Sequence, residues 1–127
     1  MAGLASHGAK VYMGARDELK ALRSIQDIKT QVPNAQVHFL SVDLSSLHDI
    51  VSAAVKLRSV EPVLHGLVNN AGVMGVPFSL TADGYEVQFQ VSSVHTLIRP
   101  WRGLDISFRG SNSHNMLYRP TTFPTGS

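Results

Sequence analysis

Residues 63–72 read Val-Leu-His-Gly-Leu-Val-Asn-Asn-Ala-Gly, an apolar run followed by two amides and two small residues. The first six residues are rich in valine and leucine, which favour a buried strand. The run therefore predicts a strand over 63–68, with the Asn-Asn-Ala-Gly segment (69–72) directly beyond its carboxyl end.

Two strand–helix units precede this strand along the chain. Residues 9–14 place a β-branched and an aromatic residue at the centre of a short strand. Apolar residues then recur every three positions, as on an amphipathic helix; they are Leu19, Leu22, Ile25 and Ile28. Asp17 is suited to cap the start of this helix, and Pro33 is suited to end it. Residues 36–42 predict the next strand.

A second helix is predicted between the last two of these strands. Ser46-Leu47-His48-Asp49 has the spacing of a capping box, and Pro62 ends the apolar stripe that follows. Residues 81–86 read Thr-Ala-Asp-Gly-Tyr-Glu and predict a further helix, capped by Thr81. Strands that alternate with helices of this length indicate parallel pairing through crossover helices, so the predicted fold class is α/β.

The regular pattern ends near Arg99, and the two parts of the chain differ in charge. Residues 1–98 carry seven Lys/Arg and eight Asp/Glu, whereas residues 99–127 carry four arginines and one aspartate. We expect one α/β domain over 1–98 and an irregular, disordered tail over 99–127, punctuated by proline and glycine. The arginines of the tail form no helical face, so nucleic acid is not expected as a partner.

The composition is that of an ordinary domain of modest size. The 127 residues include 43% hydrophobic and 16% charged residues, which argues against global disorder. No apolar run approaches the roughly 18 residues of a membrane span, and the chain has no cysteine. No two histidines have the i, i+4 spacing of a helical metal pair, so no metal site is expected. A cytoplasmic location fits these features.

Several segments resemble the short-chain dehydrogenase/reductase family. They are Gly-Ala-Lys-Val-Tyr-Met-Gly-Ala-Arg (8–16), Val-Asp-Leu-Ser (42–45), Leu-Val-Asn-Asn-Ala-Gly (67–72) and Thr-Ala-Asp-Gly-Tyr-Glu-Val-Gln-Phe-Gln-Val (81–91). The last is similar to the retinol-dehydrogenase-like branch. The resemblance implies a Rossmann-type doubly wound parallel sheet, here incomplete because the chain supplies only its second to fourth strands. It also implies an NAD(P)-dependent oxidoreductase that acts on alcohol or carbonyl groups, and it leaves a homo-oligomer open.

Polar residues stand at the predicted strand ends, where doubly wound sheets bind their ligands. Arg16 ends the family's second strand, where an arginine pairs with the 2′-phosphate of NADP and an acidic residue would hold the ribose of NAD. The expected cofactor is therefore NADP more than NAD. The resemblance further implies cofactor contacts from Asp43, Leu44, Asn69, Asn70, Ala71 and Gly72. The alternatives are a solvated charge at Arg16, a helix cap at Asp43 and a plain turn at 69–72.

Other functional elements of the family are not found in the sequence. No Thr-Gly-x-x-x-Gly-x-Gly turn for the pyrophosphate occurs, and no tyrosine is followed by a lysine four residues later. Ser92 stands where the family places an active-site asparagine. The resemblance therefore assigns no catalytic residue, and we expect the isolated chain to be inactive.

Three explanations of this pattern stay open. The first is an incomplete or mis-spliced gene product, truncated at both ends relative to the family. The second is a non-enzymatic nucleotide-binding or dimerisation module of the same fold. The third is an α/β nucleotide-binding domain of another family, which the Asn-Asn-Ala-Gly motif (69–72) argues against.

The strand order of the family has a consequence for the sheet. In the order 3-2-1-4-5-6 the first strand lies between the second and the fourth. The chain supplies these two neighbours, at 9–14 and 63–69, but begins after the first strand. Each unpaired buried backbone group costs about 1–3 kcal/mol. We therefore expect direct pairing of these two strands, a partner chain in the gap, or an unstable and aggregation-prone chain.

Overall fold

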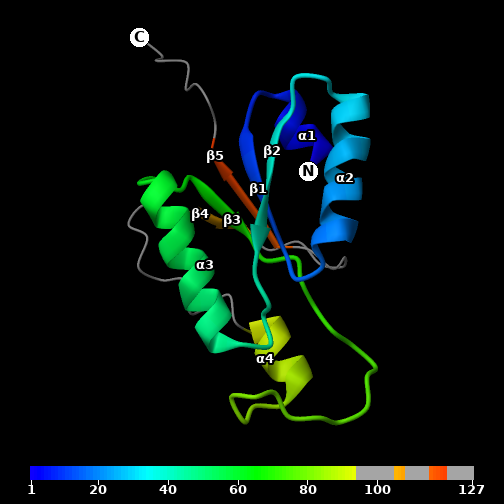
Figure 1. The fold of residues 1–127 in the computed structure, drawn as a ribbon, viewed down its shortest axis with the longest axis vertical. Coiled ribbons are helices and arrows are strands. Elements are labelled where there is room, and N and C mark those ends of the chain that lie inside the picture. Colours follow the sequence, from blue (N-terminus) through cyan, green and yellow to red (C-terminus); the bar gives the residue numbers. More distant parts are fainter. Residues whose placement is uncertain (94–104, 108–114, 120–127) are drawn as a thin grey trace.

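The structure of this chain is a computed structural model that describes residues 1–93, 105–107 and 115–119. Helices and strands alternate along its first part, as expected for an α/β fold (Figure 1). The elements are α1 (Ala2–Ser6), β1 (Lys10–Ala15), α2 (Glu18–Gln31), β2 (Gln36–Ser41), α3 (Leu47–Val60), β3 (Gly66–Val68), α4 (Val87–Ser93), β4 (Asp105–Ser107) and β5 (Asn115–Arg119).

The described strands form one five-stranded sheet in the order β2-β1-β5-β3-β4. β1 and β2 are parallel, with Lys10 opposite Gln36, and β3 and β4 are also parallel. β5 lies between β1 and β3 and runs antiparallel to both (Figure 1). The four other strands therefore all point the same way, and their carboxyl ends lie at one edge of the sheet.

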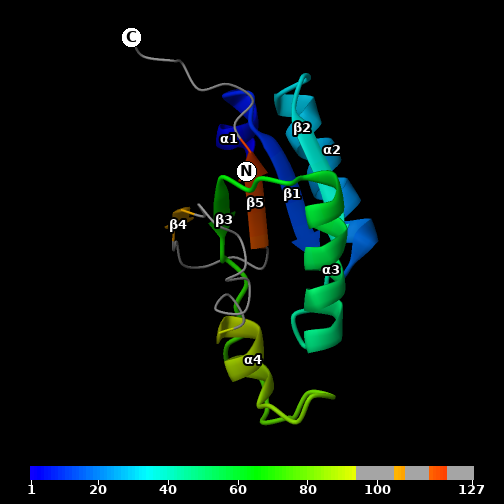
Figure 2. The ribbon, with the colours of Figure 1, turned by 90° about the vertical axis from the view of Figure 1, so that its left-hand side faces the viewer.

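Helices cover both faces of the sheet, as in a doubly wound fold (Figure 2). On one face, α1 and α2 pack against alternate residues of β1 and β2, including the fully buried Val11 and Met13. On the other face, α3 packs through Ala53 and Leu57 against residues that include Leu67 of β3. The burial of Val11 and Met13, two residues apart on β1, follows from the two-residue period of a pleated sheet. The predicted α/β class and partial Rossmann-type sheet are confirmed. None of the helices in 1–93 has the length and apolar content that a membrane crossing requires.

Two of the three predicted helix caps are confirmed, at Asp17 and Ser46. The side chain of Asp17 accepts a hydrogen bond from the backbone N–H of Lys20, at the start of α2. Ser46 accepts from the N–H of Asp49 at the start of α3. In both cases the cap satisfies a backbone donor that the first turn of a helix leaves without a partner. Asp43 therefore does not cap α3.

The helix predicted from Thr81 is wrong at its start, because α4 begins at Val87. Residues 79–87 instead form a hairpin: Thr81 N–H donates to the carbonyl of Tyr85 at 2.8 Å, and Val87 N–H donates to that of Ser79 at 3.0 Å. Gly84 has a positive φ of 81°, which permits the tight turn. Glu86 precedes α4, and its carboxylate accepts the N–H groups of the following turn.

The gap in the sheet is filled by the chain itself. β5 pairs with β1 along Lys10–Gly14 and with β3 along Gly66–Val68. Of the three expected outcomes, direct pairing of 9–14 with 63–69 is therefore wrong, because β5 lies between these strands. Backbone groups on both facing edges have a β5 partner, which removes the cost of an open slot. The expected irregular tail over 99–127 is corrected at β4 and β5, and its other residues lie outside the described part of the chain.

Candidate functional site

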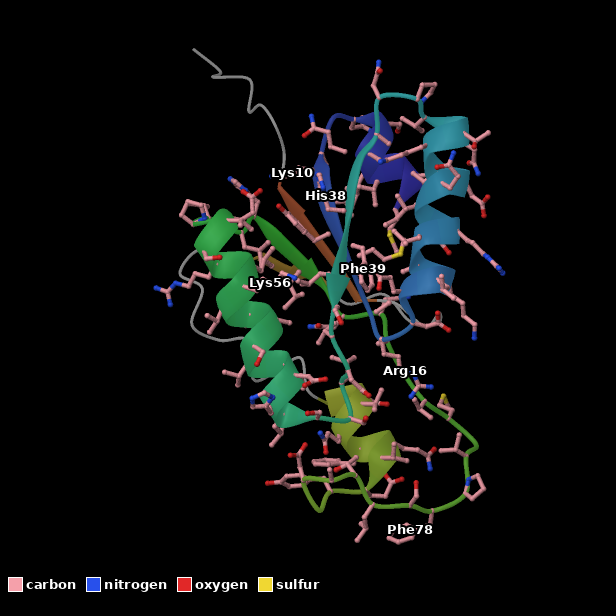
Figure 3. All side chains as sticks on the ribbon, viewed as in Figure 1. Lys10, Arg16, His38, Phe39, Lys56 and Phe78 are labelled. Atoms are coloured by element: carbon pink, nitrogen blue, oxygen red, sulfur yellow. The ribbon has the colours of Figure 1, made fainter. Side chains whose placement is uncertain are left out.

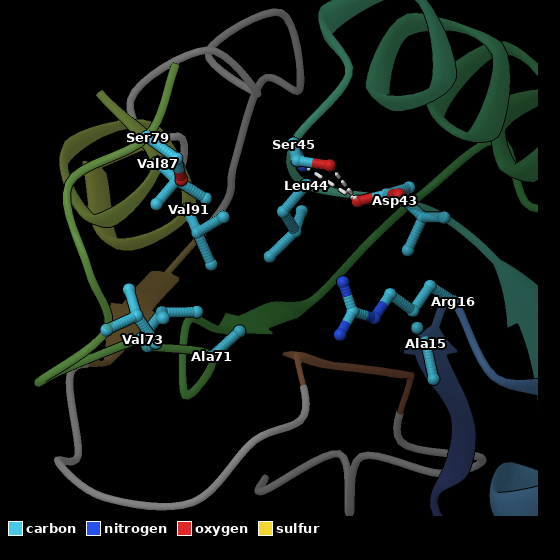
Figure 4. Close-up of a pocket in the computed structure, with 14 residues that line it drawn as sticks. Ala15, Arg16, Asp43, Leu44, Ser45, Ala71, Val73, Ser79, Val87 and Val91 are labelled. Carbon is cyan, nitrogen blue, oxygen red and sulfur yellow. Dashed lines mark hydrogen bonds between the residues drawn. The ribbon is translucent and has the colours of Figure 1, made fainter. Parts of the chain in front are cut away.

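The carboxyl ends of β1, β2 and β3 converge on a pocket of about 370 Å³ (Figure 4). This edge of a doubly wound sheet is where such folds bind ligands. The pocket is enclosed by the three segments that follow β1, β2 and β3, and by a wall made by the hairpin and α4. The lining residues are Gly14, Ala15, Arg16, Val42, Asp43, Leu44, Ser45, Ala71, Gly72, Val73, Val76, Ser79, Val87 and Val91.

Asp43 is held at the pocket by the residue two positions further on. Its Oδ1 accepts a hydrogen bond from the Ser45 hydroxyl at 2.6 Å and from the Ser45 backbone N–H at 2.9 Å. Burial of the Asp43 carboxyl acts to raise its pKa, but the two Ser45 hydrogen bonds and the positive charge of Arg16 outweigh burial and lower the pKa below its ordinary value. The pocket therefore contains a fixed, ionised carboxylate at neutral pH.

Arg16 extends from the end of β1 along the floor of the pocket, toward Ala71 and below Leu44 (Figure 4). Its side chain is solvent-exposed. Within the described residues its guanidinium forms no hydrogen bond or ion pair, and its charge acts on Asp43 only at longer range. Five planar N–H donors are thus available to an anionic group that enters the pocket.

The Asn-Asn-Ala-Gly segment (69–72) divides into two parts. Ala71 and Gly72 line the pocket, whereas Asn69 and Asn70 do not. Both polar atoms of the Asn69 side-chain amide are buried without a hydrogen-bond partner in the described part of the chain. A methyl group on Gly72 would lie 3.9 Å from the Ser92 hydroxyl, which is an ordinary contact distance.

The polar residues of the pocket are indicated by the sequence, whereas most of its apolar residues are not. Of the seven expected cofactor-binding residues, the pocket brings together Arg16, Asp43, Leu44, Ala71 and Gly72. The missed residues include Ser45 and a wall of valines: Val73, Val76, Val87 and Val91. The Asp-x-Ser spacing at 43–45 is a local signal for the Ser45 hydrogen bonds. No local signal identifies the valines, because they come from two separate segments: Val73 and Val76 follow β3, whereas Val87 and Val91 belong to α4.

A second group of polar residues lies near the opposite end of β1. The Lys10 ammonium and the Tyr12 hydroxyl both bond Glu61 Oε1, the latter at 2.8 Å. The ring of Tyr12 stacks on that of His38, with ring centroids 5.3 Å apart. Burial, together with the hydrogen bond that its hydroxyl gives to Glu61, raises the pKa of Tyr12. Tyr12 therefore has neither the location nor the acidity of a proton donor for a ligand in the pocket.

The doubly wound sheet and the pocket at its carboxyl edge define an α/β protein of the Rossmann type. Comparison with known proteins narrows this class: the sequence model of the family described as short chain dehydrogenase matches residues 1–96. The chain belongs to the short-chain dehydrogenase family, which confirms the resemblance seen in the sequence.

Relatives with curated descriptions share about half of the aligned residues. The short-chain dehydrogenase/reductase drtF of Aspergillus calidoustus is 47% identical over 106 residues, which are 84% of this chain and 34% of that protein. Human retinol dehydrogenase 12 is 43% identical over 89 residues, which are 70% of this chain and 28% of that protein. The chain therefore spans about a third of the length of these relatives.

Two solved structures have a similar fold. The crystal structure of an uncharacterised protein from Mycobacterium paratuberculosis matches with a TM-score of 0.60 and 29% identity, over 76% of this chain and 33% of that one. YwfH, an NADPH-dependent reductase involved in bacilysin biosynthesis, matches with a TM-score of 0.51 and 23% identity, over 68% of this chain and 37% of its own. The second likeness concerns the fold alone.

Proposed function

We propose that the pocket binds the adenosine 2′-phosphate end of NADP, as part of the coenzyme site of a short-chain dehydrogenase that acts on alcohol or carbonyl groups. The observation that carries this proposal is Arg16, a cation that has no ion pair among the described residues and extends along the pocket floor. A guanidinium recognises a phosphate through paired, charge-assisted hydrogen bonds. NAD, which lacks this phosphate, would leave Arg16 without a partner.

The other lining residues fit the remainder of this group. The valine wall and Leu44 offer an apolar surface for the faces of adenine, and the ionised Asp43 offers an acceptor for its exocyclic amine. Ala71 and Gly72 are small, which lets the sugar approach the backbone. When bound, the coenzyme supplies the hydride chemistry of the family, while this part of the chain holds its adenosine end.

We further propose that the isolated chain binds the coenzyme weakly and does not turn over substrate. The sequence has no glycine-rich turn for the pyrophosphate and no Tyr-x-x-x-Lys pair. A dinucleotide would thus be held at one end only. A dissociation constant of about 1 mM, equivalent to about −4.1 kcal/mol, is the strength expected of such partial recognition.

The second candidate is a nucleotide-binding module with no catalytic role. The observation in its favour is β5, which closes the sheet between β1 and β3 within the same chain. A sheet with no open slot needs no additional chain to complete its backbone pairing. In this case the chain would bind the same adenosine phosphates, and activity would be absent from every form of the protein that retains β5 in the sheet.

The test is a titration of the purified chain with adenosine 2′,5′-bisphosphate, followed by amide chemical shifts in NMR spectra, together with an assay of NADPH oxidation. We expect saturable shifts at Ala15–Arg16, Asp43–Leu44 and Ala71–Gly72, and no turnover. Shift changes spread evenly over the surface would contradict the site. Turnover by the chain alone would contradict the proposed lack of catalysis.

A further inference from the structure

Gln90 is a polar residue that α4 keeps almost fully buried, with 4% of its surface exposed. Its side-chain amide is fully used. Nε2 donates to the backbone carbonyl of Leu44 at 3.3 Å and to Asp83 Oδ2 at 2.9 Å, while Oε1 accepts from the Thr81 hydroxyl at 2.6 Å. A buried amide with every bond satisfied holds its neighbours in one geometry, because each lost bond leaves a buried polar atom without a partner.

Asp83 connects the same group to α3. Its Oδ2 accepts from the backbone N–H of Leu47, at the first turn of α3, at 2.7 Å, as well as from Gln90. One carboxylate oxygen thus joins the tip of the hairpin, helix α4 and the start of α3. The Leu47 N–H is one of the donors that the first turn of a helix leaves without an intrahelical partner.

These bonds join two opposite walls of the pocket. Leu44 belongs to the wall after β2, whereas Ser79, Val87 and Val91 belong to the wall made by the hairpin and α4. The wall made by the hairpin and α4 is not anchored by the large apolar side chains Leu80 and Phe89, because they are 61% and 63% exposed. The hydrogen bonds of Asp83 and Gln90 are therefore a main connection that sets the distance between the walls.

We propose that Asp83 and Gln90 are positioning residues for nucleotide binding: they hold the wall made by the hairpin and α4 against Leu44, and so fix the width of the space in which adenine would lie. This proposal rests on the proposed function, since it concerns the same pocket. Neither residue lines the pocket, and both act through Leu44, Val87 and Val91. They are thus distinct in role from Arg16, which would bind the phosphate directly.

Binding of two probes, with and without a 2′-phosphate, distinguishes a positioning role from direct contact with the phosphate. Gln90→Met keeps the length of the side chain and removes its hydrogen bonds, and Asp83→Ala removes the shared acceptor. Each is expected to weaken binding of adenosine 5′-monophosphate and of adenosine 2′,5′-bisphosphate by the same factor, about fivefold, or about 1 kcal/mol. Arg16→Ala is expected to weaken only the second probe. The measurement is an NMR titration of each full-length variant with both probes.

Two further variants distinguish positioning from simple loss of structure. Asp83→Asn retains an acceptor oxygen, so it should restore binding of both probes to within about twofold of the original chain. Gln88→Met changes the same helix but no bond to Leu44 or α3, and should also bind normally. Equal affinities of the original chain, Gln90→Met and Asp83→Ala would overturn the positioning role while leaving the proposed function intact. Failure of the original chain to bind either probe would instead overturn the proposed function.

Discussion

The two ends of β1 both carry a basic residue, but the two residues have opposite surroundings (Figure 3). At the amino end, the Lys10 ammonium is paired with Glu61, whose surface is only 2% exposed, and lies over the ring of Tyr12. Just beyond the carboxyl end, Arg16 has no ion pair among the described residues, although an ionised carboxylate lines the same pocket. One end of the strand satisfies its charges internally, and the other leaves a charge available.

The two ends of β1 should therefore affect different properties of the chain, namely its folding stability and its binding of a ligand. A buried carboxylate such as Glu61 is tolerated in a folded protein only when it is paired. Its removal therefore lowers the stability of the whole fold. An exposed arginine without a partner contributes little to folding stability, and its guanidinium N–H groups can bind a ligand. Changes at the amino end should therefore alter unfolding alone, and changes at the carboxyl end should alter binding alone.

The largest expected effect comes from the strand that supports both ends. Leu117→Pro places a proline at the centre of β5, where it removes a ladder donor between β1 and β3. A loss of about 3 kcal/mol or more is a large part of the 5–15 kcal/mol that stabilises a domain. Chemical denaturation should show a lost or much earlier transition, with aggregation in gel filtration.

The matched control for β5 is Leu117→Val, which keeps the ladder and the strand preference at the same position. It should unfold close to the original chain. If Leu117→Pro unfolds at the same denaturant concentration as Leu117→Val, then β5 does not complete the sheet, and the gap between β1 and β3 must be closed in another way.

The next effect concerns the amino end. Glu61→Ala removes the partner of Lys10 and the acceptor of the Tyr12 hydroxyl. We expect a loss of about 2–3 kcal/mol, less than for a fully buried pair because 28% of the Lys10 side chain is exposed. Glu61→Gln keeps an acceptor and should lose less. Denaturant unfolding measures both variants, and an accompanying loss of affinity for adenosine 2′,5′-bisphosphate would contradict the separation of the two ends.

The smallest effect is a dependence of stability on pH at His38. Burial, followed by the charges of Lys10 and Lys29, lowers the pKa of His38 in the folded chain. Its contribution to stability is thus complete above the unfolded pKa of about 6.5 and is lost as pH falls through the folded pKa. The denaturant concentration at the midpoint of unfolding should decrease as the pH is lowered from about 7.5 to about 5. His38→Gln should make this decrease smaller. An unchanged pH profile in His38→Gln would assign the dependence to another group.

The features that the sequence predicted are those that depend on residues close together in the chain. The caps at Asp17 and Ser46 use donors within the next three residues, and the strands before Arg16 and Asp43 follow from local apolar runs. Because parallel strands end at one edge, the positions of Arg16 and Asp43 in one pocket also followed from topology. These parts of the fold and site needed no long-range information.

What the sequence did not predict depends on contacts between distant residues. Gln90 resembles a surface residue of an amphipathic helix, and only its bond to Leu44, 46 positions earlier, shows that it is buried. The hairpin at 79–87 displaced the expected helix start because backbone pairing competed with the Thr81 cap. β5 lies in a stretch punctuated by glycine and proline. It pairs with β1, which lies near the other end of the sequence.

The most direct test of the account is the preference for the 2′-phosphate, measured as the ratio of affinities for adenosine 2′,5′-bisphosphate and adenosine 5′-monophosphate at pH 7.5. Asp43 keeps its charge at this pH, because its pKa is lowered, so any change of the ratio reports on Arg16. We expect the original chain to favour the bisphosphate by about tenfold, or about 1.4 kcal/mol. Arg16→Ala should reduce this ratio to about one while its unfolding transition stays unchanged. A ratio that Arg16→Ala leaves as it was would contradict the assignment of the pocket to NADP.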